Sequence, residues 1–233
     1  MRVVSLVPSL TESLAGSGWL VGATDWCSHP AGLEVARVRG TKNPDLERII
    51  GLRPDLVVAN KEENRREDVE ALRGAGVEVL VTEITTVDEA FAELRRLFRD
   101  GLGLAPPGWL AEAEAAWDLP PPDRTLTAVV PIWRRPWMVV GSGTFTGDVL
   151  ARLGVRNLYA DHPDRYPKVG IEALNRTEPD LVVLPDEPYR FTELDGPEAF
   201  PGIRWCLVGG RHLTWYGPSM VEAPARLRAE LFG

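Results

Sequence analysis

The sequence is poor in the residues that build metal centres, disulfide frameworks and polyanion-binding surfaces. Of its 233 residues three are histidine and two are cysteine, and the net charge is −8. Lysine occurs only at Lys42, Lys61 and Lys168 and no basic run is present, which argues against nucleic acid as a partner. Cys27 and Cys206 lie in opposite halves of the chain and are too few for a disulfide framework, so we expect buried free thiols.

The common catalytic and metal-binding motifs are also missing. His29, His162 and His212 are far apart and show no HxH or HxxxH spacing, so we predict no metal site. No GxGxxG follows a strand, and the sequence has no Walker loop, GxSxG elbow or HExxH. Asp161-His162, beside Tyr166, is the best acid–base cluster, and only spacing supports it. We therefore predict a protein that is not an enzyme, with no catalytic residue and no required cofactor.

Long apolar runs are absent as well. No window approaches the roughly 18 apolar residues that a spanning helix needs, so we expect no membrane span. Residues 1–9 enter a strand-like run directly, without the apolar stretch and small-residue cleavage site of a secretory signal. As written, the sequence predicts a cytoplasmic monomer, or a periplasmic or cell-surface protein if an export signal has been removed.

The most informative feature that is present is an internal repeat. Residues 46–59 (LERIIGLRPDLVVA) return 125 positions later as residues 171–184 (IEALNRTEPDLVVL), and residues 4–8 return at 127–131. Each long copy predicts a short amphipathic helix, a Pro-Asp break and a buried strand. Proline ends a helix, and a continuous apolar run is typical of a parallel sheet. The repeat therefore predicts two homologous lobes.

Alternating strand and helix patterns predict an α/β fold. We expect two similar lobes, each a mainly parallel sheet with helices on both faces, joined by a single inter-lobe helix. The expected strands lie near residues 2–7, 20–24, 55–59, 77–81, 125–130, 137–140, 180–184 and 204–208. The expected helices lie near residues 9–16, 44–51, 64–74, 87–99, 144–153, 170–176 and 218–231.

The boundary between the lobes is predicted at a helix rich in alanine and glutamate, between proline-rich segments. One face of this helix carries Trp109, Leu110, Ala113 and Trp117. We place the N-terminal lobe at 1–105, the inter-lobe helix and linker at 106–123, and the C-terminal lobe at 124–233.

Several segments resemble those of a known family. They are residues 2–12 (RVVSLVPSLTE), 43–47 (NPDLE), 53–59 (RPDLVVA), 141–145 (GSGTF), 178–183 (EPDLVV) and 215–218 (WYGP). In this order, and over essentially the whole chain, they resemble the class III periplasmic-binding-protein-like family, the helical-backbone metal receptors. That family includes the cobalamin- and ferric-siderophore-binding proteins of ABC importers, and its inter-lobe helix falls where the sequence predicts one.

The resemblance implies a ligand in the cleft between the lobes, held by loops at the carboxyl ends of the strands. Open α/β sheets bind ligands at this edge. Tryptophan and tyrosine concentrate in these loops, and their faces suit a large flat macrocycle. The predicted ligand-binding residues are Ser9, Thr11, Trp26, His29, Lys42, Asn60, Trp133, Arg134, Trp137, Phe145, Tyr166, His212, Trp215 and Tyr216. We predict capture of a bulky corrinoid, with cobalamin or another metal chelate as ligand, in the manner of an ABC-importer substrate-binding protein.

Two alternatives stay open. The first is a ferric siderophore or haem, because arginines of the same loops would meet an anionic ligand; they are Arg134, Arg135, Arg165 and Arg190. The second is an enzyme that acts on a tetrapyrrole-like or sugar-like ligand through Asp161-His162. The resemblance also implies an ABC permease as partner. Its docking glutamates correspond to Arg66, beside Glu67, in lobe one and to the region of Thr214 in lobe two, where no acid is present.

Overall fold

The computed structural model describes residues 1–122 and 124–233, and these form two compact units. Lobe one consists of Met1–Ile84, Glu89–Leu110 and Tyr216–Pro218, and lobe two consists of Thr85–Asp88, Ala111–Trp215 and Ser219–Gly233. The predicted α/β fold of two mainly parallel lobes is confirmed. The domain limits drawn from the sequence stay a prediction, and their linker ends at Asp123, which lies outside the described residues.

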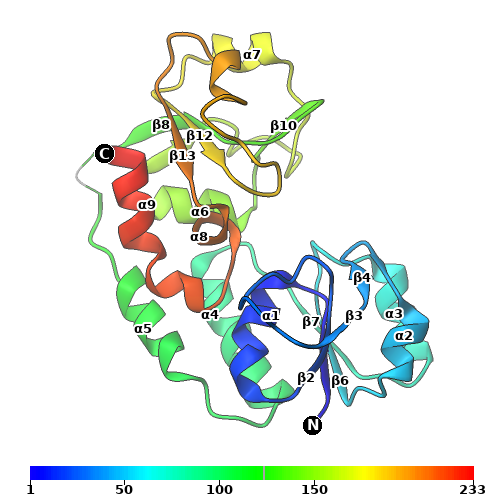
Figure 1. The fold of residues 1–233 in the computed structure, drawn as a ribbon. Coiled ribbons are helices and arrows are strands. Elements are labelled where there is room, and N and C mark those ends of the chain that lie inside the picture. The colour runs from blue at the N-terminus through cyan, green and yellow to red at the C-terminus, as the bar shows by residue number, and fades with distance from the viewer. Residues whose placement is uncertain (123) are drawn as a thin grey trace. The chain divides into compact units, whose positions relative to one another are not determined.

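Lobe one is built on a five-stranded parallel sheet. Its strands are β1 (Val3–Ser5), β2 (Leu20–Ala23), β3 (Ala36–Arg37), β6 (Leu56–Asn60) and β7 (Val79–Thr82), in the order β3-β2-β1-β6-β7. The short strands β4 (Arg39–Gly40) and β5 (Asn43–Pro44) form an antiparallel pair. Figure 1 shows α1 (Pro8–Leu14) on one face of the sheet, and α2 (Leu46–Gly51) and α3 (Arg66–Gly74) on the other. The turn η1 (Ala15–Ser17) follows α1, and α4 (Val87–Arg96) continues into the π-helical turn η2 (Leu97–Gly101).

Lobe two is built on a four-stranded parallel sheet. Its strands are β8 (Leu126–Val129), β11 (Val155–Asn157), β12 (Leu181–Pro185) and β13 (Trp205–Val208), in the order β11-β8-β12-β13. The hairpin of β9 (Pro131–Arg134) and β10 (Trp137–Val139) is separate from this sheet. The helices are α6 (Phe145–Arg152), α7 (Ile171–Arg176), α8 (Gly210–Thr214) and α9 (Ala223–Phe232), with the turns η3 (Pro197–Ala199) and η4 (Pro218–Val221). Figure 1 shows α7 on the opposite side of the sheet from α6, α8 and α9.

The two copies of the internal repeat fold alike. Their apolar runs form the interior strands β6 and β12, and every residue of both strands is buried, as the continuous hydrophobic pattern predicts. The residues before the two prolines, Arg53 and Glu178, have φ angles of 48° and 45°. Both lie in the left-handed region that non-glycine residues seldom adopt. The same unusual turn therefore ends the helix and starts the strand in each lobe.

The aspartate of each Pro-Asp step has the same partner in both lobes. Asp55 accepts a hydrogen bond from the backbone N–H of Arg2 at 2.6 Å, and Asp180 accepts one from the backbone N–H of Thr127 at 2.7 Å. The Thr127 hydroxyl also donates to Asp180 at 2.7 Å, and the two hydrogen bonds lower the pKa of Asp180. Each carboxylate thus binds the backbone at the start of the strand beside its own.

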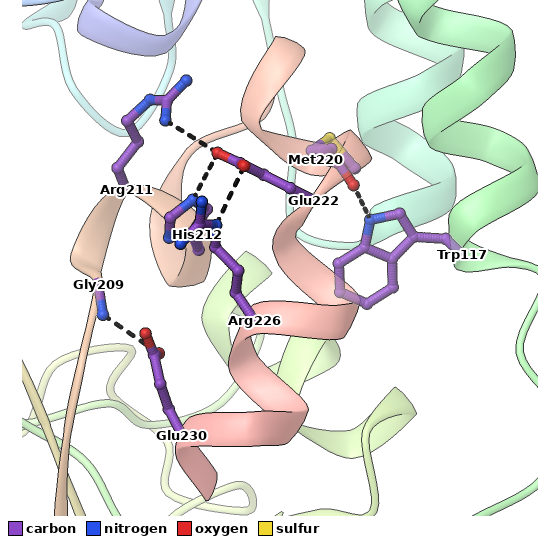
Figure 2. Close-up of polar contacts among 8 residues, drawn as sticks. All are labelled: Trp117, Gly209, Arg211, His212, Met220, Glu222, Arg226 and Glu230. Atoms are coloured by element: carbon purple, nitrogen blue, oxygen red, sulfur yellow. Dashed lines mark hydrogen bonds and ion pairs between the residues drawn. The ribbon is translucent and has the colours of Figure 1, made fainter.

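The predicted inter-lobe helix forms as α5 (Gly108–Trp117). In lobe one Trp109 packs edge-on against Phe98, with ring centroids 6.3 Å apart. In lobe two the indole N–H of Trp117 donates to the carbonyl oxygen of Met220 at 3.0 Å (Figure 2). A tryptophan therefore anchors each end of the helix.

Several elements differ from the sequence prediction. The strands β3, β9 and β11 and the helix α8 were not predicted, and two predicted elements differ in extent or pairing. Residues 218–231 were expected as one helix, but α9 begins at Ala223, after the turn η4. Pro224 lies in the first turn of α9. Backbone N–H groups of a first turn have no carbonyl partner within the helix, so proline costs no hydrogen bond there. The strand expected at 137–140 forms, but it pairs antiparallel with β9 and not within the parallel sheet.

The cysteines are free, as predicted, with Cys27 buried and Cys206 half-buried. Burial raises the pKa of the Cys206 thiol to about 12, and it also raises the pKa of Cys27. Among the described residues, no helix has the length and apolar character to cross a membrane.

Gly141 tests the packing of lobe two. A Cβ at this position would lie 2.2 Å from the carbonyl oxygen of Asp164 and 3.0 Å from that of Arg165, so alanine must displace backbone. We expect Gly141→Ala to lower the free energy of unfolding by about 1–3 kcal/mol. Gly170→Ala is the control, since the nearest atom to its Cβ would be 3.6 Å away. Thermal unfolding measures both variants, and equal melting temperatures would contradict the close contact.

Candidate functional site

Three loops of lobe one are tied together at the carboxyl edge of its sheet by the buried side chain of Asn64. Its Oδ1 accepts a hydrogen bond from the backbone N–H of Asn60 at 2.8 Å. Its Nδ2 donates to the carbonyl oxygens of Leu6 at 3.2 Å and Thr41 at 3.0 Å. These partners follow or end different strands, so one amide fixes the three loops. Residues 60–64 follow a predicted strand and were expected as one of the ligand-binding loops, but Asn64 itself was not among the predicted ligand-binding residues.

Some polar residues predicted to bind the ligand have partners inside lobe one. The Thr11 hydroxyl donates to the carbonyl oxygen of Val7 at 2.9 Å and lies 2.9 Å from the Cys27 sulfur. Asn60 donates to the Thr82 hydroxyl at 3.1 Å. The Ser9 hydroxyl is buried, and no hydrogen-bond partner is found for it among the described residues. Ligand binding by these three residues stays a prediction, beside the structural contacts of Thr11 and Asn60.

The other predicted residues of lobe one are more accessible. Trp26 is 68% exposed and is the most exposed aromatic residue among the large hydrophobic side chains of this lobe. The backbone of Gly40 lies against it, since a Cβ there would be 3.3 Å from the indole nitrogen of Trp26. Lys42 is exposed and donates to the carbonyl oxygen of Glu62, and Nδ1 of His29 lies 3.1 Å from the Ser28 hydroxyl. Trp26 is thus an accessible aromatic face on a supported loop.

In lobe two the carboxyl edge of the sheet carries an aromatic cluster. We define it as Trp133, Trp137, Tyr189, Phe191 and Phe200. Trp133 is 43% exposed and meets the ring of Tyr189 edge-on at 5.6 Å. Trp137 stacks on Phe191 at 6.1 Å and packs edge-on against Phe200 at 5.4 Å. The structure therefore brings together the predicted residues Trp133 and Trp137 with Tyr189, one of the loop aromatics expected to suit a macrocycle but not among the predicted ligand-binding residues.

Three further predicted residues of lobe two have different surroundings. Arg134 lies between the carboxylates of Asp195 and Glu198. Phe145 is buried at the first turn of α6, and Tyr166 is half-buried in the loop after β11. Ligand contacts by these residues are not tested by the structure.

The last predicted residues lie near α8. Nε2 of His212 is 2.9 Å from a carboxylate oxygen of Glu222, which also binds Arg226 at 3.0 Å (Figure 2). These two hydrogen bonds lower the pKa of Glu222. Trp215 is buried in lobe two, and Tyr216 is buried in lobe one. His212 is therefore already paired, and the two aromatic residues are mainly enclosed.

Glu187 lies in a loop expected to bind ligand but was not among the predicted ligand-binding residues, and its carboxyl group has a strongly raised pKa. It follows β12, next to Asp186, and one of its side-chain oxygens is buried without a hydrogen-bond partner among the described residues. Burial, and then repulsion from Asp186, raise its pKa to about 7, although Trp215 and Arg211 partly oppose the shift. Glu187 is thus a group at the carboxyl edge whose charge changes near neutral pH.

The acid–base pair Asp161-His162 lies in the loop after β11. Nδ1 of His162 accepts a hydrogen bond from the backbone N–H of Asp164 at 3.0 Å, and Asp161 is exposed. Within residues 1–122 and 124–233 no group of three or more His, Cys, Asp or Glu side chains is placed to hold a metal ion.

No family model matches the chain, but curated proteins do. It is 24% identical over 207 residues to a vitamin B12-binding protein of Pectobacterium carotovorum, covering 80% of this chain and 72% of that protein. It is 25% identical over 198 residues to a vitamin B12-binding protein of Photorhabdus laumondii, covering 79% and 70%. These named relatives are binding proteins.

Solved structures share the fold over nearly the whole chain. A periplasmic vitamin B12-binding protein of Vibrio cholerae matches with a TM-score of 0.78 at 19% identity, covering 98% of this chain and 95% of that one. A periplasmic heme-binding protein of Roseiflexus sp. RS-1 matches with a TM-score of 0.81 at 21% identity, covering 98% and 96%. At these identities the likeness establishes the fold alone.

Glu187 predicts a pH dependence of stability. Its pKa in the folded protein, about 7, lies above the ordinary value of 4.5, so the folded state binds the proton more tightly. The protonated form therefore stabilises the fold below about pH 4.5, and this contribution is lost as pH rises to about 7, on the order of 3 kcal/mol in total. We expect Glu187→Gln to gain stability relative to the parent at pH 8 and not at pH 4.5. Urea unfolding at the two pH values measures this, and a difference that does not change with pH would contradict it.

Proposed function

We propose that this chain, whose resemblance to the class III periplasmic-binding-protein-like family is confirmed, is a substrate-binding protein that captures one bulky corrinoid of the cobalamin type. The observation that carries the proposal is an exposed tryptophan on supported loops at the carboxyl edge of each sheet, Trp26 in lobe one and Trp133 in lobe two. Indole faces cover apolar area with little loss of side-chain freedom, which suits a flat macrocycle. The names of the relatives point to the same ligand class.

The ligand contacts in this proposal come from both sets of loops. Trp26 and Trp133 cover the macrocycle, while Lys42, His29 and Tyr166 supply hydrogen-bonding groups for its polar substituents. The framework under them is fixed by buried hydrogen bonds, such as those of Asn64, so little ordering is needed on binding. The ligand is cargo in this scheme, and no further cofactor is required.

Delivery to an ABC permease, with a periplasmic or cell-surface location, is part of the proposal. Glu67 is exposed in the first turn of α3 and supplies a carboxylate near the docking position of lobe one. The corresponding region of lobe two has Thr214, whose hydroxyl donates to the carbonyl oxygen of Gly210 at 2.8 Å. Docking in this proposal therefore depends more on lobe one than on lobe two.

The two exposed tryptophans provide the test. We expect cyanocobalamin to quench tryptophan fluorescence and to shift its own visible spectrum on binding. Trp26→Ala and Trp133→Ala should each weaken binding by about fivefold or more, because each removes a stacking face worth about 1 kcal/mol or more.

Trp205→Ala is the matched control. Trp205 is 38% exposed, close to the value for Trp133, but it is the first residue of β13 and so lies at the amino edge of the sheet. Its replacement should leave the affinity unchanged. Titrations with hemin and a ferric siderophore run in parallel. A parent protein that binds none of the three ligands would reject the proposed function, and turnover of a bound ligand would favour an enzyme.

A further inference from the structure

The positive charge of Arg134 is neutralised within lobe two. Its two terminal nitrogens contact the carboxylates of Asp195 and Glu198, and its guanidinium carbon lies 5.4 Å from the centre of the Trp137 ring. The Arg134 side chain is 16% exposed, against 41% and 51% for the two carboxylates. Two carboxylates surround one guanidinium, so this group presents no net positive charge to a ligand.

The same ion pairs reach the exposed aromatic face through Tyr189. The Tyr189 hydroxyl donates to the second carboxylate oxygen of Asp195 at 2.6 Å. The Tyr189 ring meets Trp133 edge-on at an interplanar angle of 80° and packs against Phe191 with centroids 4.7 Å apart. Asp195 therefore links Arg134 to the ring that supports Trp133.

The backbone around Asp195 is fixed by its own contacts. Thr192 and Asp195 exchange backbone hydrogen bonds at 3.1 and 3.2 Å. Gly196 follows with a φ of 132°, and a Cβ there would lie 2.7 Å from the Phe191 ring, so glycine is required on both counts. Glu198 accepts the Gly196 N–H at 2.7 Å. Desolvation raises the pKa of Glu198, but this hydrogen bond and Arg134 outweigh it, and the pKa is lowered.

We propose that Arg134 is a positioning residue, which with Asp195 and Glu198 holds Tyr189 and Trp133 as a fixed aromatic face. Lobe two then selects a bulky ligand without net negative charge over an anionic iron chelate. The inference rests on the proposed function and narrows its ligand class. Cyanocobalamin carries no net charge, whereas hemin carries two propionate carboxylates, so the two ligands distinguish the alternatives.

Removing the carboxylates should reverse this selectivity. In Asp195→Asn combined with Glu198→Gln, Arg134 keeps its charge and loses its ionic partners. We expect cyanocobalamin to bind more weakly and hemin more tightly, so that the ratio of their dissociation constants changes by about tenfold or more. Glu193→Gln is the matched control, because Glu193 is an exposed carboxylate in the same turn. In this variant the ratio of the dissociation constants for cyanocobalamin and hemin should stay at the parent value.

A milder variant separates the positioning role from a general loss of stability. Tyr189→Phe keeps the ring and removes only the hydroxyl that binds Asp195, so it should weaken cyanocobalamin binding severalfold and leave hemin binding unchanged. A variant that weakens both ligands equally, or a parent that prefers hemin, would overturn the selectivity. In the second case the exposed arginines Arg135 and Arg190 would be the groups meeting the anion.

A ligand-free measurement tests the aromatic face itself. The near-ultraviolet circular dichroism of Trp133 is obtained as the difference between each protein and its Trp133→Phe version. We expect this signal in the parent and its loss in the double variant, and a signal that is the same in both would overturn the positioning role. If the parent binds neither cyanocobalamin nor hemin, the proposed function fails. The change in the circular dichroism of Trp133 between the parent and the double variant then decides alone whether Arg134 holds the aromatic face.

Discussion

In both lobes a Pro-Asp step precedes an interior strand, and its carboxylate binds the backbone N–H at the start of the neighbouring strand. The hydrogen bonds from Arg2 to Asp55 and from Thr127 to Asp180 fix where these two strands begin relative to each other. Register in a parallel sheet decides which residues face each layer of helices, so these contacts help to set which side chains of β6 and β12 meet each layer. These hydrogen bonds lie at the amino edges of the sheets. Because they do not involve the loops at the carboxyl edges, those loops can differ between the two lobes.

The sequence predicted this framework well, because its signals are local. Each long copy of the repeat, with its proline break and its continuous apolar run, occupies 14 neighbouring positions, and the strands β6 and β12 followed directly. The pairing of β10 with β9 was harder, because three apolar residues in a row do not indicate which strand they will join. The start of α9 was missed because a helix tolerates proline in its first turn, so Pro224 gave no clear boundary.

The candidate site was predicted less completely, since a side chain's partners are distant in sequence. Arg134 was expected to meet a ligand, and nothing near it in the sequence indicates Glu198, which is 64 residues away. Asn64 likewise reaches a carbonyl 58 residues away. Residue type predicted which loops are aromatic and polar, but it did not separate side chains that support a loop from those left exposed, such as Trp26. Exposure and hydrogen bonding make that distinction, and they depend on the whole fold.

Lobe one is discontinuous in sequence, and this affects the order in which it can form during synthesis. Most of it is made first, but it also includes Tyr216–Pro218, near the end of the chain. There Gly217 lies so close to α1 that a Cβ would be 2.8 Å from the Ser13 hydroxyl and 3.1 Å from the carbonyl oxygen of Ser9. That contact waits until nearly the whole chain has left the ribosome. The lobe whose translation begins first therefore cannot be completed until most of lobe two has also been made, and only Ser219–Gly233 of lobe two follows its last segment.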